Sequence, residues 1–181
     1  CEYRDKRSFP LLLPLLDQPC PVERMSAVYA LGRNPFPSAV EKLVSLLETD
    51  DNAYVRRATA WSLANYDNEI VLKPLINSLK NDVASVRLWS SSSLAEIGST
   101  SSFNAQLAAE QLLISLKIDN EPVVRSNCIW SLCRLFEKLN EISQESFVDE
   151  CTKIALFDKE PSVMEEAKTA LDSMGMKGFY K

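Results

Sequence analysis

Hydrophobic residues recur along the chain in short stretches with helical spacing. Residues 38–48 (SAVEKLVSLLE) place apolar side chains at positions 40, 43, 44, 46 and 47, which is the three-to-four-residue spacing of one helix face. Strict alternation of apolar and polar residues, which is typical of half-buried strands, is essentially absent. The pattern therefore predicts an all-α protein.

One helical pattern occurs five times. The stretch VRRATAWSLA at residues 55–64 has near-copies at 23–32, 86–95 and 124–133, and a degenerate copy at 163–172. Aligned leucines stand at 31, 63, 94, 132 and 171, so successive copies are 32, 31, 38 and 39 residues apart. Such a period is typical of solenoids, in which a repeat buries its apolar face only against its neighbours. The sequence predicts a right-handed α-solenoid of about five antiparallel helix pairs.

Each predicted pair has a first helix and a second helix that carries the motif. The first helices are expected at residues 8–17, 38–48, 70–80, 105–117 and 144–157. Two second helices are expected to end near residues 33 and 65, and the others to cover 84–97, 122–139 and 161–174. Pro14 should kink or shorten the first of these helices, and Gly32 is expected to be a left-handed C-cap.

The repeats are expected to form a single domain over residues 8–175. Residues 1–7 are charged and are predicted to be a disordered N-terminal segment, and residues 176–181 a short tail. The polar stretch 99–104 (STSSFN) lengthens one repeat. It is either a loop that contacts a partner, as insertions in repeat arrays often do, or a tolerated longer turn.

Charge narrows the range of partners. The 181 residues hold twenty lysines and arginines against twenty-five aspartates and glutamates, a net charge of −5. Since no run of lysines and arginines occurs, the sequence carries no nucleic-acid footprint and no signature of an anionic membrane surface. The longest apolar run, residues 10–16, is far shorter than the roughly 20 residues of a transmembrane helix.

The chain has no histidine, which excludes imidazole as a general base or metal ligand. Its five cysteines have neither a CxxC nor a zinc-type spacing, which favours free thiols. Cys128 and Cys133 lie on different faces of one helix, and Cys151 could approach one of them. The default interpretation is that they are buried small apolar residues, the alternative a thiol cluster or metal site. We predict no catalytic residues and no metal ligands.

A repeated arginine suggests a structural ladder. Arg56, Arg87 and Arg125 each follow a turn position, held by Asp51, Asp82 and Asn120, by five residues; Arg24 has the same place in the first copy. An arginine fork can bond a neighbouring turn carboxylate and first-turn carbonyls, tying successive repeats together. Ligand binding by these arginines is the alternative.

Aromatic residues gather at one position of the motif. Six residues after the Val position stand Tyr29, Trp61, Ser92 and Trp130, and this offset points away from the core. On stacked second helices Tyr29, Trp61 and Trp130 would line the concave side near Arg57, as interface anchors. Alternatively, each ring packs on the adjacent second helix and helps cohesion. Trp89 occupies the place of Ala58 and is expected either in the core or as the cause of a local change in curvature.

The pattern V-R-x-A-x-x-x-x-L after a polar Asp turn resembles HEAT repeats, and the short units resemble those of phycobilin lyases and phycobilisome-maintenance proteins. The matching residues are Asp51, Val55, Arg56, Ala58 and Leu63, with Asp82, Val86, Arg87 and Leu94 in the next copy and Asn120, Val124, Arg125 and Leu132 in a looser one. Glu23 replaces Val in the first copy and Met164 replaces Arg in the last, as expected of irregular end repeats.

This resemblance implies a scaffold that holds a phycobiliprotein subunit, a bilin (linear tetrapyrrole) or both, in the cyanobacterial cytosol or plastid stroma. Any enzymatic activity would then be of the bilin lyase type, working by chaperoning rather than through a recognisable triad. Tyr29, Trp61 and Trp130 would stack on the pigment or on a partner helix, and Arg57 would pair with a carboxylate. The alternative is a pigment-free adaptor or assembly factor for a photosynthetic or iron–sulfur protein.

Overall fold

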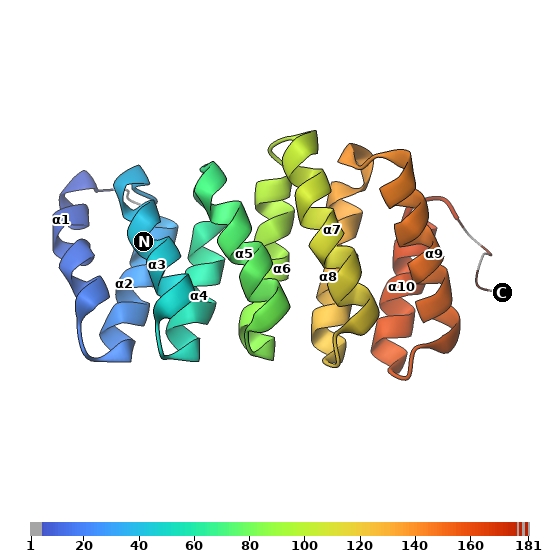
Figure 1. Cartoon of the computed structure of the whole chain (residues 1–181), viewed down its shortest axis with the longest axis horizontal. Coiled ribbons are helices and arrows are strands. Elements are labelled where there is room, and N and C mark those ends of the chain that lie inside the picture. The colour runs from blue at the N-terminus through green and yellow to red at the C-terminus, as the bar shows by residue number, and fades with distance from the viewer. Residues whose placement is uncertain (1–4, 177, 179, 181) are drawn as a thin grey trace. The chain divides into compact units, whose positions relative to one another are not determined.

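The structure is a computed structural model that describes residues 5–176, 178 and 180 (Figure 1). These residues form α-helices and short 3-10 helices, and none of them lies in a strand, which confirms the prediction of an all-α solenoid. The chain divides into two compact units, residues 1–97 (unit 1) and 98–181 (unit 2), whereas the sequence predicted one repeat domain. Because each repeat of a solenoid contacts only its neighbours, compactness is local, and the two units are described separately.

Unit 1 consists of helix pairs joined by short turns. Its α-helices are α1 (Phe9–Leu12), α2 (Pro21–Arg33), α3 (Val40–Thr49), α4 (Ala53–Leu63), α5 (Leu72–Asn81) and α6 (Ala84–Gly98, whose last residue belongs to unit 2). Short 3-10 helices are η1 (Lys6–Ser8), η2 (Leu13–Asp17), η3 (Pro37–Ala39) and η4 (Glu69–Val71). Asp5 caps η1 by accepting a hydrogen bond from the Arg7 amide, within the segment that we expected to be disordered.

The core of unit 1 lies between successive repeats. Helix α2 packs on α4, and α3 packs on both α4 and α5. Leu31 and Leu63, which the repeat aligned, are fully buried. Two hydrogen bonds cross between repeats: the Tyr66 hydroxyl donates to the Leu31 carbonyl at 3.2 Å, and Ser93 Oγ donates to the Ala60 carbonyl at 2.8 Å.

Unit 2 has two longer pairs. Its helices are α7 (Ser102–Ile118), α8 (Pro122–Leu135), η5 (Phe136–Lys138), α9 (Glu141–Phe157) and α10 (Pro161–Ser173). Helix α7 packs on α8 and α9, and α10 packs on α8 and α9. The first and second helices of one pair thus each lie against their counterparts in the other, around a core that includes Leu132, Phe147 and Leu171.

Helix boundaries follow local chemistry. The α-helix that begins at Phe9 changes to 3-10 at Leu13, next to Pro14, as expected because proline has no amide to donate. Ser101 Oγ accepts a hydrogen bond from the Asn104 amide and starts α7 at Ser102. The second half of the predicted loop, residues 102–104, is therefore the first turn of a helix.

Two glycines have different roles. Gly175 has φ +79° beyond α10, and the Met176 amide donates to the Leu171 carbonyl at 2.9 Å, which is a Schellman C-cap. Gly32 was predicted to cap α2 in the same way, and this is wrong: it is a buried residue of the helix without positive φ. A Cβ at Gly32 would lie 2.6 Å from Trp61 Cζ3 and 3.1 Å from Ser62 Cα, so this glycine lets α2 and α4 approach each other closely.

Candidate functional site

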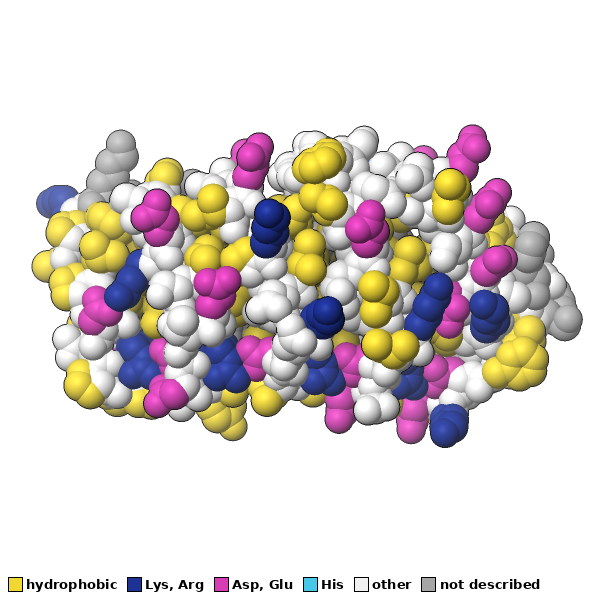
Figure 2. Space-filling view, in the orientation of Figure 1, with side chains coloured by type: hydrophobic (Ala, Val, Ile, Leu, Met, Phe, Trp, Pro, Cys, Tyr) yellow, Lys and Arg dark blue, Asp and Glu magenta, His cyan; other side chains and the backbone are white. Residues whose placement is uncertain are grey.

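The repeated arginines form rungs between successive repeats of unit 1. Arg24 donates from Nε to Asp50 Oδ2 at 2.7 Å and from Nη2 to Asp50 Oδ1 at 2.9 Å. Arg56 makes the same bidentate contact with Asp82, at 2.8 and 2.7 Å. Each Nη1 donates to a carbonyl of the turn before its own helix. Arg24 bonds the Gln18 carbonyl and Arg56 bonds the Asp50 carbonyl, both at 2.8 Å. In Figure 2, basic side chains lie beside acidic ones over the lower ends of α3 and α5.

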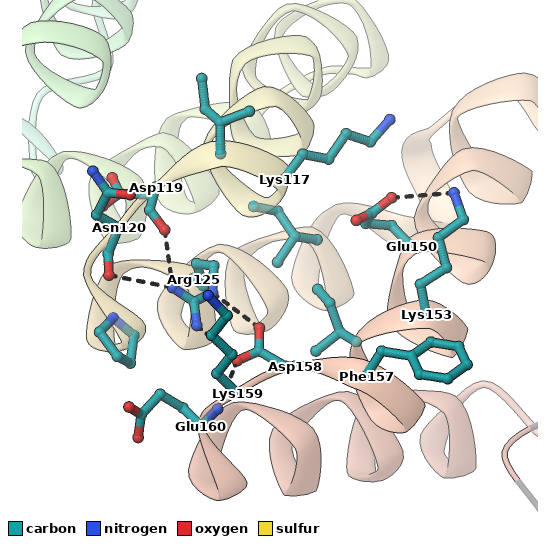
Figure 3. A pocket seen from close by; sticks show the side chains of 14 residues that line it. Lys117, Asp119, Asn120, Arg125, Glu150, Lys153, Phe157, Asp158, Lys159 and Glu160 are labelled. Atoms are coloured by element: carbon teal, nitrogen blue, oxygen red, sulfur yellow. Dashed lines mark hydrogen bonds and ion pairs between the residues drawn. The ribbon is translucent and has the colours of Figure 1, made fainter.

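Unit 2 contains a rung of the same design. Arg125 donates from Nε and Nη2 to the two carboxylate oxygens of Asp158, at 3.1 and 2.7 Å. Its Nη1 donates to the carbonyls of Asp119 and Asn120, at 2.9 and 3.4 Å (Figure 3). The remaining repeated arginine, Arg87 on α6, donates from Nη1 to the Asp82 carbonyl at 2.7 Å.

Two acidic positions of the expected ladder differ in the structure. The carboxylate that receives Arg24 is Asp50, because it caps the end of α3 and is nearly buried, while Asp51 projects into solvent and adds one contact at 3.2 Å. Asn120 gives Arg125 only its backbone carbonyl, since the arginine points forward to Asp158 in the next repeat. The spacing of 26 residues from Arg24 to Asp50 and from Arg56 to Asp82 is a sequence signal for these pairs.

The rungs alter the titration of their acids. Burial raises the pKa of Asp50, but hydrogen bonds from Arg24 and from the Asn52 amide outweigh it and lower the pKa below its usual 3.8. The same balance, with Arg125 as the partner, lowers the pKa of Asp158. The hydrogen bond with Asp82 raises the pKa of Arg56. These groups are therefore charged and paired at neutral pH, as a structural ladder requires.

A second cluster lies on α2 and α4, on the face that the motif points away from the core. The rings of Tyr29 and Trp61 are in contact, with centroids 5.4 Å apart and planes at 55°. Both side chains are half-buried, and Trp61 also covers Gly32. The pair thus helps to hold α2 on α4, and part of its ring surface remains exposed to solvent.

Arg57 lies one helical turn before Trp61 on the same side of α4. Its Cζ is 5.3 Å from the centroid of the Tyr54 ring, a cation–π contact. Its Nε is buried and has no hydrogen-bond partner among the described residues, and Arg57 forms no ion pair within this part of the chain. Unlike the ladder arginines, it keeps donor capacity that a bound carboxylate or carbonyl could use.

An open pocket of about 460 Å³ lies elsewhere, in unit 2, and one of about 630 Å³ adjoins Tyr29. The pocket beside Tyr29 is also lined by Ser26, Arg33 and Asn34 of α2 and its C-cap, and by Leu12 of α1. Its volume is within the range of sites for small molecules and cofactors. Together with Arg57 and the ring pair, it makes the α2–α4 surface the candidate binding site of unit 1.

Two further tryptophans lie on second helices. Trp89 on α6 is 38% exposed, so its expected place in the core is wrong. The equivalent position is held by the fully buried Ala58, and an indole is too large for that space. Trp130 on α8 of unit 2 is exposed, with Arg134 Cζ 5.0 Å from its ring centroid. Tyr54 and Arg134 were not singled out from the sequence. Each matters only through its cation–π contact with a residue one turn along the same helix, Arg57 and Trp130 respectively.

Two thiols of unit 2, Cys133 and Cys151, have raised pKa values. Burial, with the charge of Glu166, raises the pKa of Cys133 to about 11, and burial also raises the pKa of Cys151, which lies near Cys133. Such thiols stay protonated and behave as apolar residues. Over residues 5–176, 178 and 180, no group of three Cys, Asp or Glu side chains could hold a metal ion. In the same residues no helix has both the length and the hydrophobicity to cross a membrane.

Comparisons with known proteins give the same architecture. The family described as HEAT repeats matches residues 9–95. The chain is similar in structure to the complex of CpcE and CpcF of phycocyanin lyase from Nostoc sp. PCC7120. The match covers 92% of this chain and 99% of the other, with 22% identity and a TM-score of 0.71. A designed armadillo repeat protein in complex with the peptide (KR)4 is similar to 94%, over 89% of its own chain, with 19% identity and a TM-score of 0.64.

An engineered protein is similar to 89% of the chain, over 76% of its own, with 21% identity and a TM-score of 0.66. No curated protein matches the sequence. At these identities the likeness concerns the fold. The repeated motif, the arginine rungs, the helix pairs and the match over residues 9–95 lead to one conclusion: the chain is an α-solenoid of HEAT-like repeats, similar in fold to a phycocyanin lyase complex.

Proposed function

We propose that this solenoid is a scaffold that binds a phycobiliprotein subunit, a linear tetrapyrrole or both through the α2–α4 surface of unit 1. The observation that carries the proposal is the contact between Tyr29 and Trp61, one helical turn from Arg57 and beside a pocket of about 630 Å³. The similarity in fold to a phycocyanin lyase complex supports the choice of partner.

Each part of this surface has a chemical task in the proposal. The Tyr29 and Trp61 rings offer apolar faces on which an extended π-system or a partner side chain can stack. Arg57 and Arg33, which lines the pocket, would pair with propionate or other carboxylate groups. Trp130 remains a proposed contact residue of unit 2, with Arg134 beside it. Because the chain lacks histidine, we assign no catalytic residue.

The proposal is tested by titrating the purified protein with phycocyanobilin and following the visible absorbance spectrum. Binding to a fixed surface restricts the pigment's conformation, so the spectrum should shift and saturate. Arg57→Gln and Tyr29→Leu should weaken binding by about tenfold each, since each removes a contact of roughly 1.4 kcal/mol. Lys80→Gln, which removes an exposed charge of α5, is the matched control and should bind normally.

A second experiment separates pigment binding from protein binding. The protein is mixed with an isolated phycobiliprotein subunit, with and without pigment, and complex formation is measured by native mass spectrometry. A complex without a spectral shift would favour the pigment-free adaptor. The absence of both a complex and a spectral shift would refute the proposal. If the proposal holds, the protein acts in the cyanobacterial cytosol or plastid stroma.

A further inference from the structure

The C-terminal ends of α7 and α9 in unit 2 form an open groove of about 460 Å³ (Figure 3). Its walls include Ile118 at the end of α7 and Phe157 at the end of α9, and the ion pair of Arg125 with Asp158 lies within it. All of the residues that line the groove belong to unit 2, so it involves none of the residues assigned above to the α2–α4 surface of unit 1.

The residue that ends each first helix differs between the two units. In unit 1, α3 ends with Thr49 and α5 with Asn81, both polar. In unit 2 the same position is Ile118, 71% exposed, and Phe157, 79% exposed. Because this position immediately precedes the C-cap aspartate in all four helices, the ladder does not require an apolar residue there.

The equivalent groove of unit 1 confirms that the fold tolerates polar walls. It has a volume of about 320 Å³ and lies between the ends of α3 and α5, with Glu48, Asn77 and Asn81 around the Arg56–Asp82 rung. Ile118 and Phe157 therefore add almost nothing to the core of unit 2. Large apolar side chains that stand exposed along one groove are a common mark of an interaction site.

The charge beside the two apolar residues is positive. Lys117 stands where unit 1 has Glu48, two residues before the C-cap, and it forms no ion pair with any residue of the described chain. Lys153 stands where unit 1 has Asn77, and it is largely exposed, with a loose 3.5 Å contact to Glu150. In Figure 3 both lysines lie on the side of the groove where Phe157 projects, and Glu160 lies on the opposite side.

The acidic groups of the groove are largely committed to the protein. Asp158 gives both carboxylate oxygens to Arg125 and is nearly buried, and Glu150 faces Lys153. The mouth beside Phe157 thus offers Lys117, which forms no ion pair with a described residue, and Lys153, which is 67% exposed and only loosely paired with Glu150. Together these three side chains carry a net charge of +1, although the chain as a whole has a net charge of −5. This local reversal of charge favours an acidic ligand.

We propose that this groove is a docking site for an acidic segment of a partner protein. An aromatic or aliphatic anchor of the segment lies between Ile118 and Phe157, and flanking carboxylates pair with Lys117 and Lys153. Burial of the two exposed apolar side chains provides most of the affinity, at roughly 25 cal/mol per Å² of apolar surface removed from water. The lysines select acidic over basic sequences.

The test uses the full chain and a fluorescein-labelled peptide with a central Phe-Leu pair flanked by glutamates, measured by fluorescence anisotropy. The substitutions Phe157→Asn, Ile118→Thr and Lys117→Glu each introduce the residue that unit 1 carries at the same position, so the fold should be retained. Phe157→Asn should weaken binding by about tenfold or more, as expected for an apolar anchor. Lys117→Glu should weaken it by about fivefold and reduce its dependence on salt between about 50 and 300 mM.

Ile142→Thr is the matched control, because Ile142 is equally exposed on α9 but lies in its first turn, far from Phe157. It should leave binding unchanged, and a peptide with lysines in place of the glutamates should not bind. The proposal is overturned if the acidic peptide does not bind, if both peptides bind alike, or if Phe157→Asn has no effect. It is also overturned if sedimentation shows that the wild-type chain self-associates through this groove and Phe157→Asn abolishes the association.

Discussion

Removing either partner of the Arg56–Asp82 ion pair is expected to destabilise unit 1 much more than removing an exposed ion pair. Arg56 is 17% exposed and Asp82 11%, and two charge-assisted hydrogen bonds of 2.8 and 2.7 Å join them. Asp82 also accepts the Val83 amide at 2.7 Å, and Arg56 donates to the Asp50 carbonyl at 2.8 Å. Loss of one partner therefore leaves a nearly buried charge that water reaches poorly.

The size of the effect follows from this burial. Breaking a fully buried pair costs about 3–5 kcal/mol, and the residual exposure of both groups places Arg56→Ala at the lower end, about 3 kcal/mol. In a double-mutant cycle with Asp82→Ala the coupling free energy should be about 2 kcal/mol, a factor of roughly 30 in the unfolding equilibrium. The exposed pair Asp17–Lys42, which also joins two repeats of unit 1, should give about 0.5 kcal/mol or less.

Urea denaturation followed by tryptophan fluorescence measures these values. Unit 1 contains Trp61 and Trp89, and unit 2 contains Trp130, so a Trp130→Phe background restricts the signal to unit 1. A loss of about 3 kcal/mol should lower the urea midpoint by on the order of 1–2 M. The reasoning is refuted if the coupling of Arg56 with Asp82 does not exceed that of the exposed pair.

Three other results are expected. Gly32→Ala should destabilise unit 1 by about 2 kcal/mol, because the new Cβ would lie 2.6 Å from Trp61; a variant as stable as the wild type in urea would contradict the close packing. Since the pKa of Asp50 is lowered on folding, its contribution to stability is complete above pH 3.8 and should be lost as the pH falls below that value; urea midpoints from pH 6 to 2.5 should show this loss, and Asp50→Asn should reduce it. Cys133, with its pKa raised to about 11, should react slowly with iodoacetamide at pH 8, and the exposed Cys20 quickly; equal rates by mass spectrometry would show that Cys133 is accessible.

Much of the fold could be predicted because its causes are local. The helical spacing of apolar residues, the repeat and the prolines that begin α8 and α10 are all present in short stretches of sequence. The tendency of the arginine fork to bond turn groups is equally local. In the structure, Arg56 and Arg125 each form an ion pair with an aspartate of the following repeat.

The differences arise where a residue depends on a distant partner. Asp50 and Asp51 are adjacent, and only the position of Arg24 in the preceding repeat determines which of them forms the ion pair. The role of Gly32 depends on Trp61 in the next repeat. The start of α7 was also missed. Ser101 caps this helix by accepting a hydrogen bond from the Asn104 amide, but the polar stretch around it has the composition of a loop. The period of the repeat carries no information about which partner or ligand the surface binds.

The rungs are directional: in the pairs Arg24–Asp50, Arg56–Asp82 and Arg125–Asp158, the arginine of one repeat reaches the aspartate of the following repeat. An in-frame duplication of residues 50–81, which run from one rung aspartate to just before the next, would therefore supply both halves of the additional contact at once. The one new junction, between residue 81 and the second copy of residue 50, would need no compensating substitution. A chain built in this way can change its length by whole repeats more easily than by a few residues, and growth or loss of repeats in evolution should follow that step.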